Sequence, residues 1–271
     1  MEIIICAAIV GGIGLILSIA LVLASKFLAV KQDETFTKVR ACLPGANCGA
    51  CGYSGCDGYA QALASGQTDK TNLCVPGADA VSKALSDTLG TEFCDVIEQV
   101  AVVNCVGTCN VAKKPVELGG LQSCAAASLL PTSADGCAYG CLGLGDCAAV
   151  CPENAICLDN GIAHIDTRKC IGCGLCMRTC PRKVISLIAD VEQTIVACSN
   201  KEKGAATRLK CTSGCIGCGK CERNCPTGAI KVVNNLAHIN HDLCDGCDKC
   251  AAGCPVGCII KSDFSGYHRF K

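Results

Sequence analysis

The chain contains no tryptophan, and aromatic residues make up only 3% of its 271 positions. Aromatic side chains supply much of the large apolar surface in ordinary protein cores, so little of that surface is available here. The sequence also lacks a P-loop and a flavin-attachment pattern. Its one near-match to a dinucleotide fingerprint, at Gly12 and Gly14, lies inside an apolar run rather than after a strand. The sequence therefore indicates no site for hydride transfer on this chain.

Cysteine is the residue in excess, with 30 copies. A disulfide framework of such density is typical of short secreted proteins, and this chain is neither short nor obviously secreted. Zinc sites also use Cys-x2-Cys pairs, but they usually separate two pairs by a dozen or more residues. Three cysteines in one short loop, followed by Cys-Pro, are typical of [4Fe–4S] ligation instead. We expect clusters that cross-link the chain where a conventional core is small. A cysteine-rich zinc scaffold is the non-redox alternative.

Three cysteine runs match the bacterial ferredoxin pattern C-x2-C-x2-C-x3-C-P residue for residue. They are Cys170 to Cys180, Cys215 to Cys225, and Cys244 to Cys254, and a fourth, stretched run contains Cys137, Cys141, Cys147 and Cys151. In two-cluster ferredoxins the fourth cysteine of each run binds the cluster of the other run. Consecutive runs therefore pair into one module, and the pattern predicts an electron conductor.

An internal duplication organises these runs. A shift of 74 residues, the separation of Cys124 and Cys198, superposes nine cysteines of one copy on nine of the other without a gap. In this register Leu144 stands opposite Cys218, so the first copy needs another ligand, and Cys137 is the only nearby candidate. The predicted sets in the first module are Cys137, Cys141, Cys147 with Cys180, and Cys170, Cys173, Cys176 with Cys151. Those in the second are Cys215, Cys218, Cys221 with Cys254, and Cys244, Cys247, Cys250 with Cys225.

A different cysteine pattern precedes the duplication. Cys48, Cys51 and Cys56 lie in a glycine-rich loop, and Cys74 follows after a short expected helix over residues 57–65. Small residues allow a backbone to fold closely around a cluster and to offer N–H groups to its sulfurs. Taken alone this spacing suits zinc as well, but beside four ferredoxin runs it predicts a fifth [4Fe–4S] cluster. We expect the flanking Cys42 and Cys94 to be buried apolar thiols.

Five cysteines between and within these motifs remain unassigned, namely Cys105, Cys109, Cys124, Cys198 and Cys211. Their number is sufficient for a sixth cluster that bridges the two modules, and the predicted ligands are Cys105, Cys124, Cys198 and Cys211. The alternative, that these residues are inert buried thiols, stays open. We expect Cys6, Cys157 and Cys258 to be packing residues.

The N-terminal segment predicts a membrane anchor. Residues 3–25 carry no charge, and a helix of this length can cross a bilayer. A cleaved signal peptide is the alternative, but a basic region is absent before the apolar run, where Glu2 stands. Lys26, Lys31, Lys38 and Arg40 follow the run, which predicts that the remainder lies in the cytoplasm, where thiols stay reduced.

Charge is unevenly distributed although the formal net charge is zero. Residues 42–100 hold seven acids and two bases, whereas residues 101–271 hold fourteen acids and eighteen bases. Opposite potentials accelerate encounter between proteins, so the C-terminal part is a candidate docking surface for an acidic ferredoxin. The alternative is that these bases only offset the negative charge of the clusters.

The block Asn47-Cys-Gly-Ala-Cys-Gly-Tyr-Ser-Gly-Cys56, the stretched run from Cys137 to Cys147 and the apolar N-terminus together resemble the B subunit of the Rnf complex, in its longer form with two ferredoxin modules. The resemblance covers nearly the whole chain. It implies a membrane complex that passes electrons between reduced ferredoxin and NAD, coupled to movement of Na⁺ or H⁺. It also implies that hydride chemistry and ion pumping belong to partner subunits, one of which binds flavin and NAD. An electron wire for a hydrogenase or another reductase, without a pump, is the alternative.

The expected fold is α+β, with one transmembrane helix, a small iron–sulfur domain and two tandem ferredoxin-like modules. The expected boundaries are an anchor over residues 1–26, a linker over 27–41, the N-terminal cluster domain over 42–100, and modules over 101–197 and 198–271. We expect the protein in the cell membrane with its cluster domains on the cytoplasmic side, and we expect no role for nucleic acid.

Overall fold

A computed structural model describes residues 34–113, 120–131, 136–190 and 194–261, together with residues 11–12, 14–15, 17–19 and 21–23. Within these ranges, none of the helices has the length and apolar character that a membrane crossing requires. Most of the expected anchor, including Cys6, lies outside the described residues. The anchor therefore stays a prediction.

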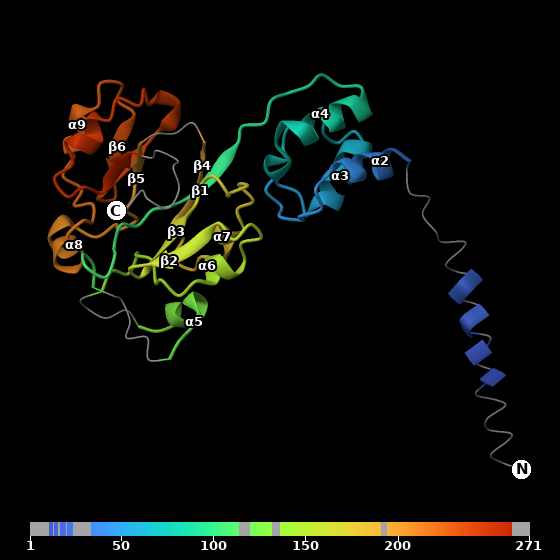
Figure 1. Cartoon of the computed structure of the whole chain (residues 1–271), viewed down its shortest axis with the longest axis horizontal. Coiled ribbons are helices and arrows are strands. Elements are labelled where there is room, and N and C mark those ends of the chain that lie inside the picture. The colour runs from blue at the N-terminus through green and yellow to red at the C-terminus, as the bar shows by residue number, and fades with distance from the viewer. Residues whose placement is uncertain are drawn as a thin grey trace, which may run out of the picture.

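Three helices and a short 3-10 turn build the N-terminal domain. They are α2 (Glu34–Cys42), α3 (Cys56–Ala64), η1 (Val75–Gly77) and α4 (Ala78–Leu89). Val39 of α2, Tyr59 and Leu63 of α3, and Leu85 of α4 form a common apolar core. Figure 1 shows this domain at one end of the molecule, to one side of the two modules. Its cysteine loop precedes α3, as the sequence predicted.

The first module consists of two antiparallel strand pairs and short helices. Strand β1 (Gln99–Val103) pairs with β4 (Ile185–Ala189), and β2 (Ile156–Asp159) forms a hairpin with β3 (Ile162–Ile165). The turn of this hairpin uses Asn160 and Gly161, both with positive φ, as a two-residue turn between twisted strands requires. The helices are α5 (Cys124–Ser128), α6 (Asp146–Ala149) and α7 (Leu175–Thr179).

The second module repeats this plan. Strand β5 (Thr194–Val196) pairs with β8 (Ile259–Lys261), and β6 (Ile230–Val233) pairs with β7 (Leu236–Ile239). Its helices are α8 (Gly204–Lys210), α9 (Lys220–Asn224), η2 (His241–Leu243) and α10 (Lys249–Ala252). The hairpins and the helices α6/α9 and α7/α10 occupy matching places, which confirms the duplication.

At the beginnings of the two copies, strand pairing gives a different correspondence of residues from the ungapped 74-residue shift. Strand β1 ends two residues before Cys105, and β5 ends two residues before Cys198. Because β4 and β8 are equivalent and β1 and β5 are their partners, the structural counterpart of Cys198 is Cys105, not Cys124. The first copy therefore carries an insertion between its first strand and its first ferredoxin run, and α5 lies in it. These pairings favour modules that begin at β1 and β5, a few residues before the boundaries expected at 101 and 198.

The segment after β1 packs against the second module. Ala112 forms a β-bridge with Cys211, the Lys113 N–H donates to the Lys210 carbonyl at 3.1 Å, and Thr212 N–H donates to the Val111 carbonyl at 2.9 Å. Nearer to β1, the Ser199 hydroxyl donates to the Asn104 carbonyl at 3.0 Å. The modules are thus joined by backbone hydrogen bonds close to the unassigned cysteines.

Candidate iron–sulfur cluster sites

Cys48, Cys51, Cys56 and Cys74 lie together in the N-terminal domain and are called site 1. Cys56 and Cys74 are buried in the apolar core, and Cys51 packs against it. Burial raises the pKa of Cys74 to about 11, and its three partner cysteines add to the shift. The loop is fixed locally, because Asn47 Oδ1 accepts the Cys56 N–H at 2.9 Å. The structure thus gathers the four residues that the sequence predicted.

Site 2 consists of Cys151, Cys170, Cys173 and Cys176, which line one hollow of the first module. Burial raises the pKa of Cys176 to about 11, with further contributions from Cys170, Cys173 and Cys151. Backbone N–H groups point at two of the sulfurs, from Ala101 to Cys170 at 3.4 Å and from Ala155 to Cys151 at 3.3 Å. The predicted set is again brought together.

Site 3 differs from the predicted set in one member. The hollow beside α6 is lined by Cys124, Cys141, Cys147 and Cys180, whereas Cys137 lies in another hollow. Burial raises the pKa of Cys147 to about 12, and Cys141, Cys124 and Cys180 act on it electrostatically. Cys124 of the inserted helix α5 is therefore the fourth cysteine of this hollow, where the counterpart of Cys218 is missing.

Two residues explain why α5 lies over site 3. The Asp146 carboxylate, at the start of α6, accepts the Cys124 and Ala125 N–H groups at 2.8 and 3.0 Å and the Ser123 hydroxyl at 3.0 Å. Burial alone would raise its pKa, but these hydrogen bonds hold it below the usual range. Leu144, the residue opposite Cys218 in the repeat, packs against the small apolar cluster that contains Cys124 and Ala127. The residue that stands in place of a cysteine thus helps to hold the helix that brings Cys124 to this hollow.

The second module holds two further sets. Site 4 is Cys215, Cys218, Cys221 and Cys254, which line one hollow together with Cys258. Site 5 is the predicted set Cys225, Cys244, Cys247 and Cys250, of which the structure brings Cys244, Cys247 and Cys250 together. Burial raises the pKa of Cys250 to about 11, and Cys244 and Cys247 add to the shift. Cys225 ends α9, the place that Cys151 has after α6 in the first copy.

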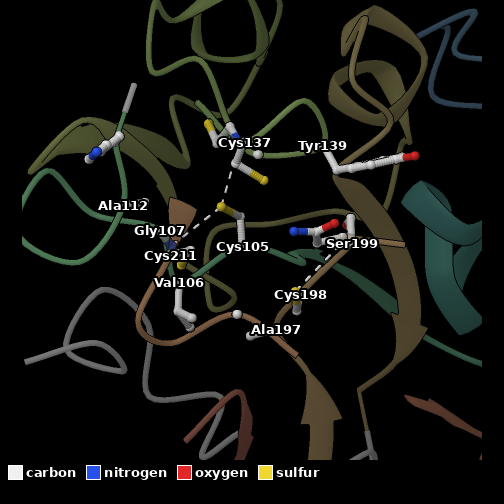
Figure 2. A pocket seen from close by; sticks show the side chains of 15 residues that line it. Cys105, Val106, Gly107, Ala112, Cys137, Tyr139, Ala197, Cys198, Ser199 and Cys211 are labelled. Carbon is white, nitrogen blue, oxygen red and sulfur yellow. Dashed lines mark hydrogen bonds between the residues drawn. The ribbon is translucent and has the colours of Figure 1, made fainter. Parts of the chain in front are cut away.

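A further hollow lies between the modules and is called the central site. Cys105, Cys137, Cys198 and Cys211 line it, and Figure 2 shows their side chains around one space. The predicted bridging set contained Cys124 in the place of Cys137. In the structure these two residues have exchanged sites, because the ungapped repeat pairs Cys124 with Cys198 and cannot register the insertion.

Four of the other described cysteines lie apart from these sets, whereas Cys258 lines the hollow of site 4, with its Sγ 3.7 Å from Cys254 Sγ. Cys42 is half-buried, and Cys94, Cys109 and Cys157 are exposed. The expectation of a buried Cys94 is wrong, because the surface segment after α4 is held through its backbone, where the Cys94 carbonyl accepts the Ser82 hydroxyl at 2.7 Å. The expected packing role fits Cys258, which is 1% exposed, but not Cys157 on the outward face of β2.

The donor chemistry of these sites fits iron–sulfur clusters. Thiolates are the protein ligands of [4Fe–4S] clusters, and N–H groups directed at sulfur are one means of setting their potential. Burial disfavours an isolated thiolate and so raises the thiol pKa values, which a bound cation offsets. Within the described ranges, no three His, Cys, Asp or Glu side chains converge as ligands of a single metal ion. In a [4Fe–4S] cluster, by contrast, each cysteine binds a different iron.

Fold and sites together define a multi-cluster iron–sulfur protein of the ferredoxin class. Three family models match the chain: a putative Fe-S cluster domain over residues 43–76, a 4Fe-4S binding domain over 163–186, and a 4Fe-4S dicluster domain over 214–258. These matches favour iron–sulfur clusters over a zinc scaffold.

Curated relatives extend over most of the chain. The B subunit of the Na⁺-translocating ferredoxin:NAD⁺ oxidoreductase complex of Acetobacterium woodii is 40% identical over 87% of this chain and 71% of its own length. The B subunit of the proton-translocating complex of Clostridium ljungdahlii is 43% identical over 86% and 82%. The B subunit of the ion-translocating oxidoreductase complex of Methanosarcina acetivorans is 35% identical over 88% and 90%. The chain belongs to this family, the B subunits of ion-translocating ferredoxin:NAD⁺ oxidoreductase complexes, and is an electron-transfer subunit.

Proposed function

We propose that this chain accepts electrons from reduced ferredoxin and relays them, one at a time, within an ion-translocating ferredoxin:NAD⁺ oxidoreductase complex. Five [4Fe–4S] clusters at sites 1 to 5 would carry them. The observation that supports this most directly is the succession of four-cysteine sets through the fold. The relatives of the chain are subunits of such complexes. The family favours this function over a hydrogenase wire without a pump.

The chain's own part in the reaction is to hold and tune the clusters. A bound [4Fe–4S] cluster supplies one-electron transfer, with no hydride and no covalent intermediate. The cysteines fix its place, the buried surroundings exclude water, and backbone N–H groups such as those of Ala101 and Ala155 donate to the ligand sulfurs. Hydrogen bonds to sulfur and burial both adjust reduction potentials. Hydride chemistry and ion movement then belong to partner subunits.

Contacts between the sites support an order for the relay. The Arg178 guanidinium donates to the Cys48 carbonyl of site 1 and to the Cys173 carbonyl of site 2, the latter at 3.3 Å. Cys147 of site 3 interacts electrostatically with Cys176 of site 2. Sites 4 and 5 share the second module. The N-terminal domain therefore lies at one end of the row and the second module at the other.

The proposal includes a membrane location and partners. We propose that residues 3–25 anchor the chain, that its cluster domains face the cytoplasm, and that it assembles with other membrane and peripheral subunits, including one that binds flavin and NAD. A reporter fused after Lys271 should be active only in the cytoplasm. Activity only on the outer side would overturn the proposed orientation.

The function is tested on the complex purified anaerobically through a tag on this chain. We expect a brown preparation whose visible absorbance bleaches on addition of reduced ferredoxin, together with polytopic membrane subunits and a flavin-bearing NAD subunit. A colourless preparation that contains zinc would overturn the cluster assignment. A brown preparation that ferredoxin does not reduce, or that copurifies with a hydrogenase, would overturn the proposed donor or complex.

A further inference from the structure

We infer that the central site, formed by Cys105, Cys137, Cys198 and Cys211, binds a sixth [4Fe–4S] cluster that joins the two ferredoxin modules. This inference rests on the proposed function, because it extends the row of clusters at sites 1 to 5. The four cysteines come from four segments, two in each module, and they line one hollow. Since each module supplies only half of the ligands, neither could bind the cluster alone.

The central site has the size and contacts of the other candidate sites. Its hollow has a volume of about 460 Å³, the solvent at its mouth included, compared on the same basis with about 390, 350 and 310 Å³ for the hollows of sites 3, 2 and 4. Cys137 acts electrostatically on each of the other three cysteines, which places it near all of them. Cys105 and Cys211 are both 8% exposed. Cys137 and Cys198 are half-buried, so the site combines two buried and two half-buried cysteines, as site 2 does.

The hydrogen bonds to sulfur follow a local twofold pattern. Cys105 Sγ accepts the N–H of Gly107, two residues later, and the N–H of Cys141, both at 3.4 Å. Cys198 Sγ accepts the N–H of Asn200, two residues later at 3.5 Å, and the N–H of Cys215 at 3.3 Å. Cys141 and Cys215 are equivalent in the repeat. The duplication makes the same two donors recur in both modules, and N–H groups directed at cysteine sulfur are the contacts that tune the potential of a bound cluster.

A buried amide gives independent support. Asn200 lines the hollow and is 2% exposed. Its Oδ1 accepts the Glu202 N–H at 2.8 Å, but among the residues that the structure describes its Nδ2 has no hydrogen-bond partner. A buried donor without an acceptor costs about 1–3 kcal/mol. The sulfur atoms of a cluster in this hollow would supply the acceptor.

The central site also occupies the gap in the proposed row. Cys141, a ligand of site 3, lines both that hollow and the central one, and its N–H donates to Cys105. Cys215, a ligand of site 4, donates its N–H to Cys198. A cluster bound here would be next to one site in each module. Electrons could then pass singly between the modules, with no proton or covalent bond exchanged.

Iron analysis of the full chain, purified anaerobically with its clusters, tests the inference without an activity assay. Six clusters hold about 24 irons and five hold about 20. We expect about 24 in the wild type, about 20 in Cys137→Ser and in Cys198→Ser, and about 24 in the control Cys157→Ser, whose thiol is exposed on β2. The wild-type count is decisive even where a variant does not fold, since a value near 20 would refute the sixth cluster.

Double variants identify the ligand set. Cys137 and Cys198 belong to one site in the structure, so the pair Cys137→Ser with Cys198→Ser should still hold about 20 irons. Cys124 belongs to site 3, so Cys124→Ser with Cys198→Ser should hold about 16. The opposite result would assign Cys124 to the bridge and refute this set, as would a single zinc ion in place of four irons. A wild type with little or no iron would instead be a failure of the proposed function itself.

Discussion

Replacing Gly143 with alanine should destabilise the first module through a backbone contact. Gly143 lies in the loop between Cys141 and Cys147, with φ of +71°, and a Cβ at this position would lie 2.2 Å from the Gly161 carbonyl oxygen in the β2–β3 turn. Real Cβ contacts of this length do not occur, so the loop or the hairpin must move. The left-handed conformation costs about 1–2 kcal/mol, and overpacking costs about 1–3 kcal/mol. The expected loss is therefore about 2–5 kcal/mol.

The duplication supplies the control. Gly228 has φ of +67°, a Cβ added there would have no atom within 4 Å, and its counterpart in the first copy is Asn154 at φ +49°. Gly228→Asn reproduces a residue that this fold already accepts, so we expect a change below about 1 kcal/mol. Because asparagine tolerates positive φ better than alanine, Gly228→Ala is added as the variant that has the cost of positive φ without a steric contact, and its difference from Gly143→Ala isolates that contact.

The assay is urea unfolding of the loaded full chain under anaerobic conditions, followed by cluster absorbance and by iron retained after gel filtration. With a urea dependence of about 1–3 kcal/mol per molar, Gly143→Ala should lower the midpoint by about 1–2 M and release about four irons first, those of site 3. Gly228→Asn should leave the midpoint almost unchanged. Equal midpoints for the two alanine variants would show that the close contact between Gly143 and the β2–β3 turn is not required for the stability of the first module.

Three further substitutions test other contacts. Arg178→Gln should weaken docking of site 1 on site 2 by about 0.5–1.5 kcal/mol, since the guanidinium is exposed, and should slow reduction of one group of clusters up to about tenfold in stopped-flow mixing with ferredoxin. The control Arg223→Gln loses a hydrogen bond to the Cys218 carbonyl within its own loop, so it should not slow this reduction. Equal rates for the two arginine variants would contradict the role of Arg178. Asp146→Asn should lower the free energy of unfolding by about 1–2 kcal/mol, because it loosens the start of α5, and about four irons of site 3 should be lost on dilution. Asp190→Asn, at an exposed position, is its control. An unchanged iron content in Asp146→Asn would argue against the capping role of Asp146. Tyr59→Phe removes a buried hydroxyl that donates to the Lys70 carbonyl at 2.6 Å, so the thermal midpoint of the N-terminal domain should fall by an amount equivalent to about 1–2 kcal/mol, whereas Tyr53→Phe should leave it unchanged.

Much of the candidate chemistry could be predicted from local spacing. Site 1 and site 2 contain the cysteines that the sequence grouped, because three members of each lie on one loop, and the two-cluster ferredoxin rule assigns Cys151, the fourth member of site 2, from the preceding run. The duplication predicted that the two copies share their elements, and both contain the same hairpin. The contacts of Arg178 were not, because a hydrogen bond across 130 residues leaves no periodic signal in the chain.

The assignment of Cys124 and Cys137 shows where sequence reasoning reached its limit. An ungapped register pairs Cys124 with Cys198, and in that register Cys137 is the nearest replacement for the ligand lost at Leu144. The pairing of β1 with β4 and of β5 with β8 makes Cys105 the counterpart of Cys198 instead. The helix in the insertion then places Cys124 in site 3, and Cys137 is left to the central site.

By itself the sequence determined the class of protein, the number of ferredoxin runs and their duplication, because these depend on cysteine spacing within single loops. Only the tertiary structure decided which of Cys124 and Cys137 lies in site 3 and which in the central site, and in what order the hollows follow one another. The physical reason is that ligands within one loop are held together by the covalent chain, whereas ligands from distant segments are held together by strand pairing and helix capping. Such long-range hydrogen bonds can accommodate an insertion without any change in the local motif.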